Sequence, residues 1–222
     1  MLNTKINWWK YLTIALVIYT VVAGLLTEVP RLPILNETIR NLYFHVPMWF
    51  CMTVLLLISV IYSILYLVKP EIKNDFYAVE TANTGIFFGI LGLITGSIWA
   101  KYTWGTFWTS DPKLNAAAIG ELIYIAYIIL RGSFQDEQQR ARIGAVYNLF
   151  AFPIFISIIY IIPRLTDSLH PGNGGNPAFS QYDLDSRMRL VFYPAVAGFI
   201  LLGVWFTSLR VRLRMIEYQI EQ

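Results

Sequence analysis

The sequence predicts an all-α, polytopic membrane protein with six transmembrane helices, and two observations carry that prediction. Residues of the AVILMFWYC set make up 56% of the 222 residues, whereas charged residues make up only 14% and the mean hydropathy is +0.53. Soluble globular chains carry about 25% charged residues. The second observation is the grouping of the apolar residues into six stretches of near-membrane length that are separated by mostly short loops.

The six stretches, in chain order, are residues 11–26, 46–68, 82–99, 116–130, 143–162 and 190–209. Five of them contain no charged residue, and the fourth contains only Glu121. A transmembrane helix needs about 20 mostly apolar residues. The six spans therefore leave no room for a second folded unit, and residues 1–222 are expected to form a single integral-membrane domain. The first stretch is expected to be an uncleaved anchor, because no small-x-small cleavage site follows it.

The distribution of Lys and Arg predicts that the N and C termini are both cytoplasmic. With that topology, ten of the 17 basic residues face the cytoplasm and seven lie on the outer side. The cluster Arg210, Arg212 and Arg214 follows the last span directly and contributes most to this bias. The outer loops are then residues 27–45, 100–115 and 163–189. The inner segments 69–76 and 131–142 are expected to be plain charged connectors.

Composition also excludes several functions. A single cysteine excludes a disulfide framework, a Cys-rich zinc site and an iron–sulfur cluster made by this chain alone. The net charge of +3 is spread along the chain, so no nucleic-acid partner is expected. No Gly-x-x-x-x-Gly-Lys-[Ser/Thr] motif is present, so this chain is expected neither to hydrolyse ATP nor to act as an enzyme.

The most unusual segment is Trp-rich; it begins at the end of the third span and continues through the outer loop 100–115. Trp99, Trp104 and Trp108 are three of the seven tryptophans of the chain and fall within ten residues. An interfacial aromatic belt explains such residues in part. It explains less well Gly105, which would let the backbone approach a flat ligand, and Asp111, which with the following proline is a typical helix start. A belt and a ligand platform remain equally open for this loop.

The chain has only two histidines, and the predicted topology places both on the outer side. His45 precedes the second span, where Trp49 would share its helix face four residues on, and His170 lies in a loop rich in Gly, Asn and Pro. Each histidine alone is most simply interfacial or solvated. Two are too few for a protein-only zinc site but suffice for the two axial positions of one haem iron.

A bound haem would use these unusual features together. Aromatic side chains can pack on the macrocycle, and the absence of a Cys-x-x-Cys-His motif indicates haem b, held non-covalently. Basic side chains on the same side of the membrane would hold the propionates, and the candidates are Lys113, Arg187, Arg189, Arg40 and Arg164.

The spans themselves contain two further features. Glu121 lies well inside the fourth span, and such a carboxylate is a functional candidate because its burial is costly. Four glycines in the third span (Gly85, Gly89, Gly92 and Gly96) form one helix face and predict close helix packing.

The segment Trp104-Gly105-Thr106-Phe107-Trp108-Thr109-Ser110-Asp111-Pro112-Lys113-Leu114 resembles the WWD motif of haem-handling membrane proteins in cytochrome c biogenesis. With its six spans, the chain resembles the haem exporter protein C (CcmC) family over essentially its whole length. The segments Tyr43-Phe44-His45-Val46-Pro47 and Leu169-His170-Pro171 match the two histidine positions of that family. The sequence departs from the motif at Phe107 and Ser110, where the family often has Trp.

The resemblance implies that His45 and His170 are the axial ligands of the haem iron. The implied haem platform consists of Trp104, Gly105, Trp108 and Asp111, with Trp49 and the aromatic Phe107 beside them. The resemblance also implies haem transfer at the periplasmic face of the bacterial inner membrane, or of the equivalent organellar membrane. The implied partners are a periplasmic haem chaperone, the ATPase and membrane subunits of an ABC transporter complex, and a small membrane accessory subunit.

Three alternatives remain open at this point. The chain could be a component of a cytochrome c haem lyase or synthase, which promotes thioether formation. It could be a b-type electron-transfer cytochrome of the membrane. It could also be a permease subunit without haem, in which the aromatic residues form only a belt.

Overall fold

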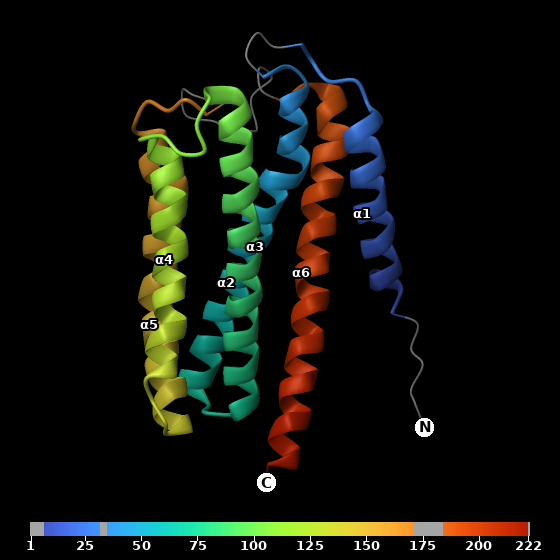
Figure 1. Cartoon of the computed structure of the whole chain (residues 1–222). Helices are drawn as coiled ribbons and strands as arrows, with labels where there is room; N and C mark the ends of the chain where they lie inside the picture. The colour runs from blue at the N-terminus through green and yellow to red at the C-terminus, as the bar shows by residue number, and fades with distance from the viewer. Residues whose placement is uncertain (1–6, 32–34, 171–183, 222) are drawn as a thin grey trace.

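The computed structural model of this chain describes residues 7–31, 35–170 and 184–221. These residues form a helical bundle without strands, and six of its helices are long and apolar enough to cross a membrane (Figure 1). The predicted all-α, polytopic class is therefore confirmed. The long helices are α1 (Trp8–Leu26), α2 (Leu42–Val68), α3 (Ile72–Trp104), α4 (Pro112–Gly132), α5 (Glu137–Ile156) and α6 (Ser186–Ile220); the short helical turns are η1 (Asn36–Asn41), η2 (Ser157–Ile161) and η3 (Ile162–Arg164).

The six helices pack in three layers. α2 and α3 form the central pair, α1 and α6 pack on one side of it, and α4 and α5 pack on the other (Figure 1). The largest apolar cluster lies between the central pair and the α4–α5 layer and includes Met52, Phe88, Tyr124 and Phe155. α1 begins and α6 ends toward the same end of the bundle, which we call the far end. The opposite end, which carries the loop between α3 and α4, is called the cavity end.

The loop between α3 and α4 is defined by two local signals. α3 ends at Gly105, which adopts a left-handed conformation (φ +81°) and donates its amide to the Lys101 carbonyl at 3.1 Å. α4 begins at Pro112 after Asp111, whose side chain accepts hydrogen bonds from the backbone amides of Lys113 and Leu114. The non-helical segment is therefore residues 105–111, which is shorter than the outer loop expected from hydropathy at residues 100–115.

His45 lies inside helix α2, whereas it was expected in the loop just before the second span. Residues 27–45 were expected to form an outer loop, but η1 runs directly into α2, and His45 is the fourth residue of α2. The difference arises because the helix extends beyond the apolar stretch that begins at residue 46. This placement holds the imidazole on a rigid element of the bundle.

The inner segments 69–76 and 131–142 are not plain charged connectors. Asp75 on α3 and Arg131 on α4 form a buried ion pair with two hydrogen bonds of 2.7 Å. Glu80, also buried on α3, accepts hydrogen bonds from Arg210 at 2.7 Å and Arg214 at 3.2 Å, both on α6. Because the charges of Asp75 and Glu80 are paired, α3 can begin at Ile72, which is ten residues before the predicted span 82–99, and still bury these two side chains.

Candidate functional site

A cavity of about 380 Å³ lies at the cavity end, between the central helix pair and α4. Both histidines line it, together with Trp49, Trp99, Trp108 and a largely apolar set that includes Leu42, Val46, Phe50, Leu93, Leu114 and Ile159. A volume in this range is typical of small-molecule sites, which are mostly apolar with a few polar groups. Side chains of α2, α3, α4, η1, η2 and η3 meet here, so the cavity exists only in the folded bundle.

His45 is held with one ring nitrogen bonded and the other directed into the cavity. Its Nδ1 lies 2.9 Å from the Gly92 carbonyl oxygen and 3.2 Å from the Thr95 hydroxyl. A carbonyl can only accept a hydrogen bond, so Nδ1 carries the proton and Nε2 keeps its lone pair. The ring packs against Gly96, where an added Cβ would stand 2.7 Å from the His45 Cε1 atom.

Trp49 follows His45 on the same face of α2. The two rings meet edge to face, with centroids 6.4 Å apart and an interplanar angle of 72°. The indole lies over Gly92, where an added Cβ would stand 2.8 Å from the Trp49 Nε1 atom. The glycine face of α3 thus packs against α2, and it also provides the space in which His45 and Trp49 sit.

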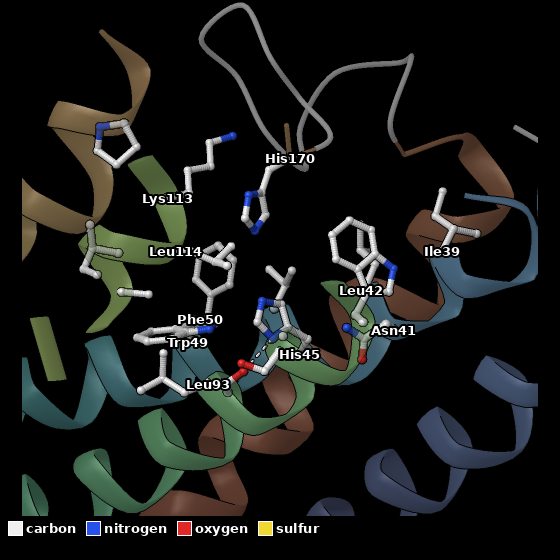
Figure 2. A pocket seen from close by; sticks show the side chains of 18 of the residues that line it. Ile39, Asn41, Leu42, His45, Trp49, Phe50, Leu93, Lys113, Leu114 and His170 are labelled. Carbon is white, nitrogen blue, oxygen red and sulfur yellow. Dashed lines mark hydrogen bonds between the residues drawn. The ribbon is translucent and has the colours of Figure 1, made fainter. Parts of the chain in front are cut away.

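His170 approaches the cavity from the side opposite His45 (Figure 2). Its Nδ1 lies 2.9 Å from Asp111 Oδ1, and because a carboxylate only accepts, Nδ1–H donates; in the neutral imidazole Nε2 then keeps its lone pair. In Figure 2 the rings of His45 and His170 face the same space from its two sides. The two histidines therefore share one arrangement, with Nδ1 bonded to the protein and Nε2 without a hydrogen-bond partner among the described residues.

Asp111 organises the segment that carries His170. Besides capping α4, its buried carboxylate accepts hydrogen bonds from the Leu169 amide at 2.6 Å and the Ser168 hydroxyl at 2.9 Å. Burial on its own would raise the pKa of Asp111, but the hydrogen bonds from His170, Leu169 and Ser168 together lower that pKa below its ordinary value. Asp111 is therefore a negatively charged anchor at neutral pH, and it holds the segment that carries His170.

The aromatic residues of the Trp-rich segment divide into two groups. Trp104 and Trp99 pack around the His170 ring, with centroid distances of 4.9 Å and 5.9 Å, and the Trp99 indole donates to the Thr38 carbonyl at 3.1 Å. Trp108 lines the cavity and is 44% exposed, whereas Phe107 is 59% exposed and does not line it. Gly105 ends α3 and has open space where a side chain would be.

The basic residues proposed as propionate partners are separated by the fold. Lys113 lines the cavity. Arg187 lies outside it and pairs with Glu28 at 3.4 Å and Asp185 at 3.7 Å. Arg189 also lies outside the cavity lining and donates from Nε to the Leu184 carbonyl at 3.0 Å.

The two remaining candidates do not line the cavity either. Arg40 bonds to Glu37 and to the carbonyls of Gly24 and Thr27. The Arg164 side chain lies outside the part of the chain that the structure describes.

The structure adds residues that sequence reasoning did not select. Ser168 supports both Asp111 and the backbone of His170, which donates to its hydroxyl at 3.1 Å. Tyr160 lines the cavity from η2, a turn of π-helix, and forms a 2.7 Å hydrogen bond with Thr53 on α2. Turns of π-helix occur frequently at functional sites. Nothing in the sequence marks these two residues, because the bonds of Ser168 with Asp111 and of Tyr160 with Thr53 join segments that are far apart in the chain.

The donor set fits a haem. It offers two imidazoles whose Nε2 atoms have no hydrogen-bond partner among the described residues, an apolar cavity lined by indole rings, and Lys113. The described residues contain no group of three or more His, Cys, Asp and Glu side chains that could hold a metal ion by themselves. Fold and site together define a polytopic α-helical membrane protein with a paired-histidine cavity at one end of its bundle.

The chain belongs to the CcmC family. The family model described as heme exporter protein C matches residues 1–222. Heme exporter protein C of Paracoccus denitrificans is 26% identical over 177 residues, which cover 80% of this chain and 73% of that protein. The Escherichia coli K12 protein of the same name is 26% identical over 177 residues, covering 80% and 70%. A putative cytochrome c biosynthesis ccmC-like mitochondrial protein of Marchantia polymorpha is 25% identical over 174 residues, covering 77% and 72%.

Proposed function

We propose that this protein binds haem b non-covalently in the cavity between His45 and His170 and presents it to a periplasmic haem chaperone during c-type cytochrome biogenesis. The observation that carries the proposal is the matched state of the two imidazoles, which both bond through Nδ1 and leave Nε2 for one apolar cavity. The family, whose members are named heme exporter protein C, supports a role in haem handling. The role is one of transport and presentation, not of catalysis.

The proposed placement is in the inner membrane of a bacterium, or the organellar equivalent, with the cavity end at the periplasmic face. The six membrane-length helices and the family members, which include a mitochondrial protein, support it. The proposed partners besides the chaperone are the ATPase and membrane subunits of an ABC transporter complex and a small membrane accessory subunit. The name exporter that the relatives carry supports such an assembly.

In this proposal the chain's residues have distinct tasks. His45 and His170 supply the two axial nitrogens, and the haem supplies the iron and the flat apolar ring that these residues recognise. Trp49, Trp99 and Trp108 line the cavity beside that ring, and Lys113 is the propionate partner. Lys113 lines the cavity, whereas Arg187 and Arg189 do not, so Lys113 takes precedence over them.

Release to a chaperone requires that one imidazole leaves the iron, and we propose His170 for that step. His45 is part of a helix that packs closely against α3, and its ring is confined by Gly96. His170 lies in a non-helical segment, and its ring is held through Asp111 and the hydrogen bonds around it. Breaking one set of hydrogen bonds moves His170, whereas moving His45 requires the central helix pair to separate.

The test is the visible spectrum of the purified protein after addition of ferric haem, for the wild type and for His45→Ala and His170→Ala. The wild type is expected to show a low-spin Soret spectrum. Each variant is expected to lose it and to bind at least about ten times more weakly, because even loss of a residue that supports a metal ligand typically costs that much. Free imidazole serves as the control, since it should restore the low-spin spectrum of each variant. A spectrum that is indifferent to both substitutions rules out this site.

A further inference from the structure

Glu121 on α4 differs from the other buried carboxylates of the described structure. Asp75, Glu80 and Asp111 are each bonded to cationic side chains or to amide and hydroxyl donors. Glu121 is only 2% exposed, and neither of its carboxyl oxygens has a hydrogen-bond partner. A buried carboxyl group without a partner is costly, and inside a membrane protein it indicates function.

The carboxyl group lies one helical turn beneath the cavity. Ala117 of α4 lines the cavity, and Glu121 follows four residues later, about 6 Å further along the helix axis. The neighbouring helices show the same relation, because Trp49 and Gly92 line the cavity while Met52 and Gly89 lie one turn below. Glu121 is in contact with this lower layer, where a Cβ at Gly89 would collide with its carboxyl oxygen and with the Met52 sulfur. The glycine thus leaves a space that the carboxyl group fills.

No side chain of the described residues forms a hydrogen bond with the carboxyl group of Glu121. Its neighbours on α2 and α3 are Met52 and Gly89. On its own helix the next polar group is Tyr124, which donates to Asn148 of α5.

The titratable groups on the other elements around α4 are bonded elsewhere. Tyr147 of α5 donates to the Ile123 carbonyl, and Tyr160 of η2 bonds to Thr53. The nearest buried charge pair on α4 is that of Arg131 with Asp75, and it begins ten residues further along, about 15 Å away.

We propose that Glu121 is the internal counter-charge of the haem cavity, releasing a proton when ferric haem binds and taking one up when the iron is reduced. This inference rests on the proposed function. A ferric haem core with two neutral imidazoles has a net charge of +1, and a carboxylate one turn away stabilises that charge in a medium of low dielectric constant. Glu121 takes up one proton from the aqueous phase at the cavity end as the iron gains one electron from a reductant such as dithionite, and the net charge of the pair stays the same.

The first experiment detects the carboxyl group directly by infrared difference spectroscopy. The empty wild-type protein is expected to show the C=O stretch of a buried carboxylic acid, and Glu121→Gln is expected to lack it. The band should disappear when ferric haem is added and return after reduction with dithionite. Glu217→Gln is the matched control, because Glu217 is exposed on α6, and it should behave as the wild type.

The second experiment follows the midpoint potential of the bound haem against pH. Proton uptake with reduction makes the potential fall as pH rises, by at most about 59 mV for each tenfold change in proton activity. In Glu121→Gln the potential should not change with pH and should lie above that of the wild type at high pH, because the ferric form loses its counter-charge. Glu121→Asp keeps the carboxyl group and should keep the pH dependence with a shifted infrared band. This variant serves if Glu121→Gln does not fold.

The outcomes separate the two proposals. If the wild type binds haem through His45 and His170 but its infrared band is unaffected by ferric haem, the inference on Glu121 is wrong and the haem site stands. The same conclusion follows if Glu121→Gln keeps the wild-type pH dependence. If no haem binds, or binding ignores both histidines, the proposed function itself fails and the role of Glu121 fails with it.

Discussion

At the scale of single residues, Asp111 determines how His170 is presented to the cavity. One carboxylate caps α4, holds the Leu169 amide and accepts the His170 Nδ1–H bond. Outer-shell carboxylates of this kind fix the tautomer and orientation of a metal-binding imidazole. The aspartate of the Trp-rich motif therefore has a structural task that differs from stacking on a ligand.

Asp111→Asn tests this role, because Asn caps a helix about as well as Asp. We expect α4 to remain intact and the affinity for ferric haem to fall by about tenfold, since the neutral amide holds the His170 imidazole less firmly. Haem titration followed in the Soret region measures the change. Asp136→Asn is the matched control, because Asp136 caps α5 with a 2.6 Å bond to Gln139 and should leave haem affinity unchanged. Equal affinities of Asp111→Asn and the wild type would contradict the role.

The pKa of Asp111 predicts a pH dependence of stability with a definite sign. The folded-state pKa is lower than the ordinary carboxyl value of 3.8, so the charged group stabilises the fold above that value. The stabilisation should decrease as pH falls below 3.8 toward the lowered pKa. Thermal unfolding of wild type and Asp111→Asn should therefore differ at pH 7 and converge in strong acid. A difference that grows on acidification would contradict this assignment.

At the scale of elements, the packing of α2 against α3 sets the position of His45 and Trp49. The four glycines on one face of α3 were predicted to allow close helix packing. In the structure, added Cβ atoms on Gly92 and Gly96 would meet the Trp49 and His45 rings. The same helix face that brings the two helices together thus also shapes one wall of the cavity.

Gly96→Ala is expected to push the His45 ring out of place. The new Cβ would stand 2.7 Å from Cε1, and such overpacking typically costs about 1–3 kcal/mol. We expect a lower thermal midpoint in detergent and a weaker, altered Soret spectrum. Gly132→Ala is the control, because no atom lies within 4 Å of the added Cβ, and it should behave as the wild type. An unchanged spectrum in Gly96→Ala would show that the ring does not depend on this contact.

At the scale of the whole molecule, ion pairs of two buried carboxylates, Asp75 and Glu80, join the three layers of the bundle at the far end. Asp75 connects α3 to Arg131 on α4, and Glu80 connects α3 to Arg210 and Arg214 on α6. These pairs hold the two outer layers against the central one at the end opposite the cavity.

Arg131→Met should destabilise the protein by about 3–5 kcal/mol, because it leaves Asp75 buried without its partner. The double variant Asp75→Asn with Arg131→Met should recover much of that loss, since the uncompensated charge is removed as well. Thermal unfolding in detergent measures both. The exposed pair Lys69–Glu71 offers the control, and Lys69→Met should have little effect. A double variant as unstable as Arg131→Met would show that the charge is not the cause.

A feature of the site could be predicted from the sequence only where the residues that form it lie close together in the chain. Asp111 and Pro112 mark the start of α4 by local rules, and Gly105 marks the end of α3. The bond from His170 to Asp111 joins residues on separate segments, and no periodicity reports it. The inner connectors were misjudged for the same reason, because hydropathy scores Asp75 and Arg131 as surface charges while each neutralises the other inside the bundle.

The sequence alone therefore determined the class of the protein, its six helices and the residue types available for a ligand. It could do so because a bilayer requires long apolar helices whose backbone hydrogen bonds are satisfied within each segment, so the signal is local. Only the tertiary structure decided that His45 and His170 share one cavity, that Lys113 and not Arg187 lines it, and that Glu121 lies beneath it. The physical reason is that a cavity and its bonded side chains arise from the packing of helices distant in sequence, and packing contacts leave no periodic trace in a single chain.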